Sequence, residues 1–185
     1  MTIELVSFAD IKSVINLEDA AITDYPGLGI IRDNVVFAIE SYLSRYLENT
    51  DYTQSVKVMS KTKMIPLRAL PVESISTVTV STLGVDESLT EHNDYMITDY
   101  GILLDSSVNR SSVDVEYTGG YEAADVPNEI KRAAILQTIY EFQGKDTIGA
   151  TSVSTEGGSV QTPALGLLKE VRRLLDPFKH QLAWS

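Results

Sequence analysis

The chain has 185 residues, of which 43% are hydrophobic and 22% are charged, a composition typical of a globular domain rather than a disordered segment. Its 26 acidic and 15 basic residues give a net charge of −11, which opposes tight wrapping of nucleic acid because that binding depends on cationic contacts to phosphate. There is no cysteine, so disulfides, thiolate metal sites and cysteine nucleophiles are excluded.

The basic residues are unevenly distributed along the chain. From Lys169 to Ser185 there are four basic and two acidic residues, so this end carries +2 and the remainder carries −13. An acidic body with a basic end favours head-to-tail association of copies or docking on another acidic partner. The alternative is that the cations offset the dipole of a C-terminal helix. The start of the chain lacks a signal-peptide pattern and no long apolar run follows, so we expect no contact with a membrane.

Two helices are predicted near the start of the chain. Ser7 can cap a short helix that runs to Asn16. A second helix is predicted from about Leu28 to Glu48, because apolar residues recur there at spacings of three and four and no Pro or Gly follows Gly29. The apolar stripe of this second helix consists of Ile31, Val35, Ile39, Tyr42 and Tyr46.

The hydrophobic period changes to two between Asp51 and Thr118, which predicts β-strands. Pro66 and Pro71 interrupt the early part of this block, and Asp99-Tyr100-Gly101 is typical of a hairpin turn. We expect five or six short strands. The clearest alternation lies in residues 56–58, 76–80 and 113–117.

A third helix is predicted over residues 127–143, with Pro127 in its first turn and Gly144 as its stop. Its apolar residues point in nearly every direction around the helix axis, so most of its surface has to be covered. Neighbouring copies of the chain would cover it, as would burial between the other helices. The residues expected to make these contacts are Ile135, Leu136 and Ile139.

The segment 145–162 is rich in Gly, Ser and Thr and is interpreted as a long flexible loop. Thr162 and Pro163 then resemble the N-cap and first turn of a final helix, which Pro177 ends or kinks near Asp176. Residues 181–185 form a short tail. The stripe of the final helix consists of Ala164, Leu168, Val171, Leu175 and Phe178.

These elements predict an α+β fold, in which a bundle of about four helices carries an inserted antiparallel β subdomain of five or six strands. The helical segments are residues 1–50 and 119–180, and the β insertion is residues 51–118.

No catalytic or metal-binding constellation is found. The only histidines, His92 and His180, are far apart, and neither has a histidine four residues away as in helical zinc motifs. The carboxylates Asp94, Asp99 and Asp105 lack the spacing of a calcium-binding EF-hand loop and are better explained as turn residues. We therefore expect a protein that is not an enzyme and binds no cofactor.

One basic cluster lies outside the final helix, and it consists of Lys57, Lys61, Lys63 and Arg68. Aromatic residues are not interleaved with it, and Tyr52 is the nearest. A platform for single-stranded nucleic acid is therefore a poor fit. A solvated strand face is the favoured interpretation.

The order of segments resembles the longer members of the head-tail connector (adaptor) family of tailed bacteriophages, and similar adaptors of gene transfer agents. In both, two N-terminal helices precede a β insertion, which is followed by two C-terminal helices with a loop between them. The segments that carry the resemblance are Leu70–Val80, Tyr95–Leu104, Val115–Tyr121, Val126–Phe142 and Leu174–Lys179.

The resemblance implies a ring, usually of twelve copies, beneath the portal protein of the capsid. Such a ring extends the DNA channel, lets DNA pass without tight binding, and receives the next neck or tail protein. The protein would be found in the neck of the virion, and in the host cytoplasm during assembly. Two alternatives remain open. A stopper or tail-completion protein should be mostly β, and a ligand-binding β domain would need a concave site.

The end of the chain, from about Arg172 to Trp184, is expected to dock on the portal or on an adjacent subunit. Trp184 is the only tryptophan, and an exposed tryptophan is typical of a protein interface. The alternative is that Trp184 folds back onto the β subdomain. The residues expected at this interface are Arg172, Arg173, Phe178, Lys179 and Trp184.

Overall fold

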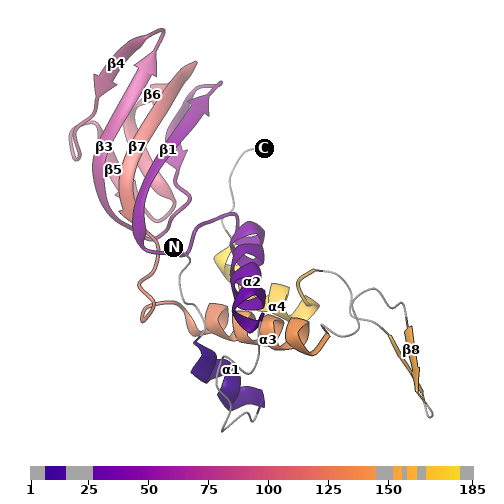
Figure 1. Cartoon of the computed structure of the whole chain (residues 1–185). Helices are drawn as coiled ribbons and strands as arrows, with labels where there is room; N and C mark the ends of the chain where they lie inside the picture. Colours follow the sequence, from indigo (N-terminus) through magenta and orange to yellow (C-terminus); the bar gives the residue numbers. More distant parts are fainter. Residues whose placement is uncertain (1–6, 16–26, 145–151, 156–157, 162–165, 180–185) are drawn as a thin grey trace. The chain divides into compact units, whose positions relative to one another are not determined.

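The computed structural model describes residues 7–15, 27–144, 152–155, 158–161 and 166–179. The chain divides into two compact units (Figure 1). Of the described residues, those up to Leu43 and those from Val126 to Lys179 form the helical unit, and Ser44–Asp125 forms the β unit. The β unit therefore interrupts the helical unit in the sequence.

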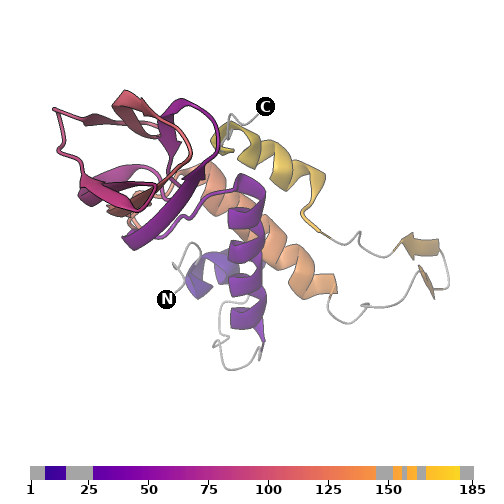
Figure 2. The same cartoon turned by 90° about the horizontal axis from the view of Figure 1, so that it is seen from above.

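In the helical unit, α3 is the central element, because α1, α2 and α4 each pack against it (Figure 2). The helices do not form the regular bundle that was expected, since two of the four are only seven or eight residues long and cannot flank α3 along its length. The helices are α1 (Phe8–Ile15), α2 (Leu28–Leu43), α3 (Asn128–Gly144) and α4 (Lys169–Leu175), followed by a 3-10 turn, Asp176–Phe178.

The helix α1 begins with a reciprocal cap. The backbone N–H of Asp10 donates to the Ser7 hydroxyl at 3.2 Å, and the Asp10 carboxylate accepts from the Ser7 backbone N–H at 3.0 Å. This arrangement satisfies two donors that a helix start leaves without partners inside the helix. The cap at Ser7 confirms the predicted start of the first helix.

The predicted second helix is too long by five residues. It ends at Leu43 rather than Glu48, because Ser44 adopts a left-handed conformation with a φ of 56°. Beyond this break the chain is extended, and Tyr46 and Glu48 form isolated bridges with Ala69 and Tyr121. Tyr46 therefore does not belong to the apolar stripe of α2. No Gly or Pro marks this break in the sequence.

Between Ser44 and Asp125, where every residue is described, the chain forms seven strands, not five or six, in two antiparallel sheets. One sheet has the order β1-β7-β3-β4 and the other has the order β2-β6-β5. The number of strands predicted from the sequence was too low, because β4 is short and exposed at all four residues and so shows no hydrophobic period. The strands are β1 (Thr50–Val58), β2 (Thr62–Pro66), β3 (Val72–Thr82), β4 (Val85–Ser88), β5 (Tyr95–Thr98), β6 (Gly101–Val108) and β7 (Ser111–Gly119).

The two sheets share one hydrophobic core. Residues from the inner faces of both sheets form a single buried cluster. Full burial of each aliphatic side chain in this cluster stabilises the fold by about 1.5–3 kcal/mol. Fully or nearly fully buried members include Ile65, Leu67, Val78, Ile102, Leu104, Val113, Val115 and Tyr117.

The final helix begins later than expected, at Lys169 instead of the Thr162-Pro163 pair. Gly166 has a φ of 103° and Leu168 is extended, with a ψ of 147°, so neither can be part of a helix. The helix ends before Pro177, as predicted. Two short strands, β8 (Ser152–Thr155) and β9 (Gly158–Gln161), pair with each other inside the segment that was interpreted as a loop.

Candidate interaction surfaces

Among the described residues, no group of three or more His, Cys, Asp or Glu side chains is placed to hold a metal ion. The described helices also include none that is long and apolar enough to span a membrane.

Of the predicted C-terminal interface residues, Arg172 and Arg173 lie on α4, and Phe178 and Lys179 lie at the end of the 3-10 turn. Arg172 and Arg173 are exposed, and Phe178 is half-buried. Val171 and Leu175 are fully buried and hold α4 to its unit. The arginines therefore lie on the solvent side of α4. Trp184 lies outside the described residues.

Lys179 and Asp176 contact the same tyrosine of α2. The hydroxyl of Tyr42 donates to the Asp176 carboxylate at 2.6 Å, and the ammonium nitrogen of Lys179 lies 4.5 Å from the centre of the Tyr42 ring. This hydrogen bond to Asp176, more than any other effect, raises the pKa of the Tyr42 phenol. The turn that follows α4 is thereby attached to α2.

The three α3 residues expected at contacts are all half-buried, namely Ile135, Leu136 and Ile139. They retain exposed surface that a partner could cover. The fully buried face of α3 instead includes the polar side chain of Gln137, which is 1% exposed. The Gln137 amide accepts from the backbone N–H of Leu168 at 3.0 Å and donates to the carbonyl of Gly166 at 3.3 Å. It positions the segment that leads into α4.

An apolar pair that the sequence analysis did not single out lies on the outer face of α2. Ile30 is 69% exposed and Phe37 is 72% exposed. Being seven residues apart, they lie on one face of the helix. Exposed apolar side chains grouped in this way are typical of a surface that another protein covers.

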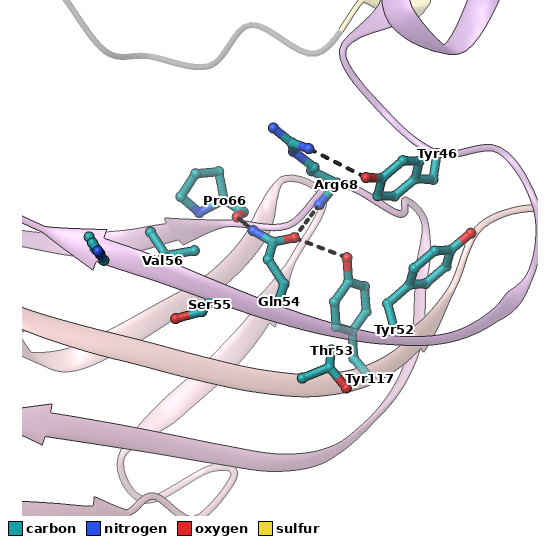
Figure 3. Close-up of a pocket in the computed structure, with 10 residues that line it drawn as sticks. Tyr46, Tyr52, Thr53, Gln54, Ser55, Val56, Pro66, Arg68 and Tyr117 are labelled. Carbon is teal, nitrogen blue, oxygen red and sulfur yellow. Dashed lines mark hydrogen bonds between the residues drawn. The ribbon is translucent and has the colours of Figure 1, made fainter. Parts of the chain in front are cut away.

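In the β unit, a groove of about 520 Å³ runs along β1, one of the two edge strands of the four-stranded sheet. Three tyrosines form its apolar wall (Figure 3). The rings of Tyr46 and Tyr52 stack with their centres 5.2 Å apart, and the Tyr117 ring lies 5.8 Å from that of Tyr52. The guanidinium of Arg68 lies 5.9 Å from the centre of the Tyr46 ring.

One side chain connects the strands on either side of this groove. The Gln54 amide donates to the carbonyl of Pro66 at 2.8 Å, and its oxygen accepts from the Arg68 backbone N–H at 3.0 Å and from the Tyr117 hydroxyl at 3.2 Å (Figure 3). The Tyr117 hydroxyl in turn accepts from the backbone N–H of Ala69 at 3.0 Å. Burial, as the largest effect, raises the pKa of Tyr117.

The groove differs in charge from the unit that contains it. Acidic residues outnumber basic ones between Ser44 and Asp125. The side chains that line the groove nevertheless include Lys57 and Arg68 and no carboxylate. The groove therefore favours a negatively charged occupant.

Sequence reasoning found only part of this groove. All four residues of the basic cluster are exposed, but Lys61 and Arg68 lie outside the strands and Lys57 and Lys63 lie on different sheets, so they do not form the one strand face that was expected. Tyr46 and Tyr117 were not connected with Arg68, because Tyr46 was assigned to a helix and Tyr117 is more than forty residues away in the sequence. No local pattern in the sequence signals this cluster.

In a comparison with protein families, the model of the head completion protein family matches residues 5–181 of this chain. A comparison with curated protein sequences finds no significant match.

Solved structures include chains of similar fold, all at low sequence identity. A chain in the neck of an empty gene transfer agent particle, computed with C6 symmetry, has a TM-score of 0.58 at 13% identity, over 98% of this chain and 92% of that one. A chain in the virion of a native gene transfer agent particle has a TM-score of 0.57 at 13% identity, over 86% and 79%. A chain in the neck of the native particle, computed with C12 symmetry, has a TM-score of 0.53 at 14% identity, over 80% and 81%.

Proposed function

Because the chain belongs to the head completion protein family, we propose that it is a structural head-tail connector subunit in the neck of a phage-like particle. The observation that carries this proposal is the extent of the family match, which covers residues 5–181 and so includes both units. The similarity of fold to a chain of a gene transfer agent neck, over 98% of the residues, supports it. The role is one of assembly and requires no catalysis.

In this proposal the protein forms a closed ring beneath the portal and receives the next neck or tail protein. Two of the similar chains come from necks computed with C6 and C12 symmetry, which supports a cyclic arrangement, and twelve copies is the expected number. A ring requires each copy to use two different surfaces, because two-fold contacts between identical surfaces would give a dimer. The half-buried residues of α3 and the apolar pair on α2 are available for such contacts.

The ring would extend the channel through which DNA passes. With a net charge of −11, the protein offers few cations for phosphate, so DNA would pass without tight binding. We expect no measurable binding of duplex DNA at physiological salt. A submicromolar affinity that does not depend on sequence would instead indicate a channel lined by Lys57, Lys61 and Lys63.

The exposed face of α4 is the proposed portal-binding surface. Arg172 and Arg173 are exposed, and Lys179 directly follows the 3-10 turn after α4. Together these three residues place positive charge at the end of the helical unit. An acidic surface on the portal would be the matching partner.

The test is to add purified protein to portal-bearing capsids that lack it and to measure binding and stoichiometry by mass. The wild type should bind in a cyclic number of copies, and a strictly dimeric stoichiometry would refute the ring. The pair Arg172→Glu and Arg173→Glu should abolish binding. A matched control, Lys12→Glu with Arg110→Glu, makes the same change in charge on α1 and on the turn between β6 and β7, and should bind normally. Deletion of residues 180–185 should also prevent binding while leaving the melting temperature unchanged.

A further inference from the structure

The four-stranded sheet of the β unit has two open edges. Among the described strands, β1 pairs only with β7, and β4 pairs only with β3 (Figure 1). All four residues of β4 are exposed. An unpaired edge presents a row of backbone N–H and C=O groups that another strand can use.

The strand registers place Lys57 and Asp86 at opposite ends of one row across this sheet. Lys57 is opposite Ser112 on β7, Ser112 is opposite Ser81 on β3, and Ser81 is opposite Asp86 on β4. Directly opposed residues point to the same face of a sheet. The row therefore begins with a positive charge at one edge and ends with a negative charge at the other.

The directions of the two edge strands also match. The sheet contains four strands and every pairing is antiparallel, so β1 and β4 run in opposite directions. A second copy placed beside the first in the same orientation would bring its β4 antiparallel to β1 of the first. No rotation of the sheet is needed for the two strands to pair.

We propose that β4 of one copy pairs with β1 of the next copy, in the register that places Asp86 beside Lys57. This inference rests on the proposed ring and names one of its contacts. The contact joins two different surfaces, so it can repeat from copy to copy and close into a ring.

The charges next to this row fit the same arrangement. Glu87 is in the row of Val80, Val113 and Val56, whose valines face the core, so it points to the inner side of the sheet. On the neighbouring copy, that side of β1 faces the groove that contains Arg68 and no carboxylate. The partner whose charge fits the groove is thus a second copy of this chain. The opposite role for edge charges is to keep strands of different copies apart, and the experiment below distinguishes the two.

The chain has no cysteine, so a pair of introduced cysteines can test this contact. The next row on the same face of the sheet runs from Ser55 on β1 through Asp114 and Thr79 to Ser88 on β4. Ser55 and Ser88, at its two ends, are exposed. Replacing both serines by cysteine leaves the charges in place. Three strand spacings of about 4.8 Å separate the two positions within one copy, well beyond the reach of a disulfide, which requires Cα atoms within about 7 Å. A disulfide between them can therefore form only between copies.

In particles assembled with the Ser55→Cys, Ser88→Cys double variant, mild oxidation should give a ladder of covalent oligomers. Neither single variant should give covalent species, and neither should the control Ser55→Cys, Ser106→Cys, whose second cysteine lies on the other sheet. A double variant that enters particles and stays monomeric on a denaturing gel would overturn the pairing while leaving the proposed function intact. Covalent dimers from a single variant would also overturn it, because they require a two-fold contact. Failure of the wild type to enter particles would instead refute the proposed function.

A charge exchange gives an independent measurement. Lys57→Asp alone and Asp86→Lys alone should each reduce the ladder when introduced into the double-cysteine chain, since each puts like charges together. Combining the two should restore it. Asp99→Lys, on the turn between β5 and β6, is the matched control and should have no effect. If edge charges keep copies apart, the single exchanges would leave the ladder unchanged or increase it.

Discussion

The Tyr42 hydroxyl of α2 donates a 2.6 Å hydrogen bond to the Asp176 carboxylate, where α4 passes into the 3-10 turn. The Lys179 ammonium covers the ring of the same tyrosine. Residues more than 130 positions apart in the sequence are thereby joined at the end of the proposed portal-binding surface. The orientation of that surface depends on a side chain that has no contact with the portal in the proposal.

Tyr42→Phe should loosen the 3-10 turn without unfolding the helical unit. The variant removes the hydrogen bond to Asp176 but keeps the ring that Lys179 covers. Hydrogen exchange of residues 176–179 should become faster, and the melting temperature should change little because this bond lies at the surface. Tyr140→Phe on α3 is the control. Unchanged exchange in the Tyr42 variant would show that the bond does not restrain the turn.

Tyr117→Phe should destabilise the β unit at neutral pH. It leaves the buried N–H of Ala69 without its partner and removes one of the two hydrogen bonds to the Gln54 amide oxygen, which should cost about 1–3 kcal/mol in the free energy of unfolding measured in urea. Tyr121→Phe, which keeps the ring that the Arg45 guanidinium covers, is the control. An equal loss in both variants would rule out this explanation.

The raised pKa of Tyr117 also predicts a dependence on alkaline pH. Above its ordinary pKa of 10.0, the phenol loses its proton in the unfolded chain but retains it in the folded chain. This contribution to stability is complete below pH 10 and is lost as the pH rises through the higher pKa of the folded state. Tyr117→Phe should therefore reduce the loss of stability above pH 10. Tyr42 and Tyr95 have raised pKa values as well, so part of the loss should remain.

Truncation of two residues of α2 should change the free energy of unfolding by very different amounts. Ile39 is fully buried, so Ile39→Ala should reduce the free energy of unfolding by about 2–5 kcal/mol. Phe37 is two residues away and 72% exposed, so Phe37→Ala should change stability by less than about 0.5 kcal/mol. Thermal unfolding of both variants checks this. A large loss from the Phe37 variant would mean that this ring is covered in the free protein.

Gly120→Ala should be much more harmful than Gly84→Ala. Both glycines have a positive φ, of 109° and 83°, so both alanines would be strained by about 1–2 kcal/mol. A Cβ at Gly120 would also lie 2.2 Å from the carbonyl oxygen of Glu48, whereas one at Gly84 would meet nothing within 4 Å. Soluble yield and melting temperature should separate the two variants. Equal behaviour would show that the backbone near Glu48 moves to make room.

The sequence predicted those parts of the fold that have a clear period. The cap at Ser7, the third helix and the alternating strands β3 and β7 lie where the spacing of apolar residues placed them. The end of α2 could not be predicted, because a left-handed serine at position 44 carries no local signal. The strand β4 was missed because a polar edge strand buries neither face, and burial is what produces alternation.

The interaction surfaces were predicted less completely than the fold. The basic end of the chain is visible in the composition, so Arg172 and Arg173 could be proposed for an interface, and the structure shows that both are exposed. The groove depends on Tyr46, Tyr117 and Arg68, which come together only through strand pairing. The position of Lys57 and Asp86 at the two ends of one row across the sheet likewise depends on three strand registers, none of which can be read from the sequence.

The position of Gln54 has a consequence for the order in which the β unit folds. Its three hydrogen bonds join β1 to residues from β2, β7 and the segment after β2, so they can form only when all of these are in place. We therefore expect these hydrogen bonds to be absent from the folding transition state. Replacing Gln54 by Ala should therefore accelerate unfolding and leave the folding rate nearly unchanged, a difference that stopped-flow measurements in urea would resolve. This glutamine would then contribute to the kinetic stability of the β unit, because it would lengthen the lifetime of the folded state without changing how fast that state forms.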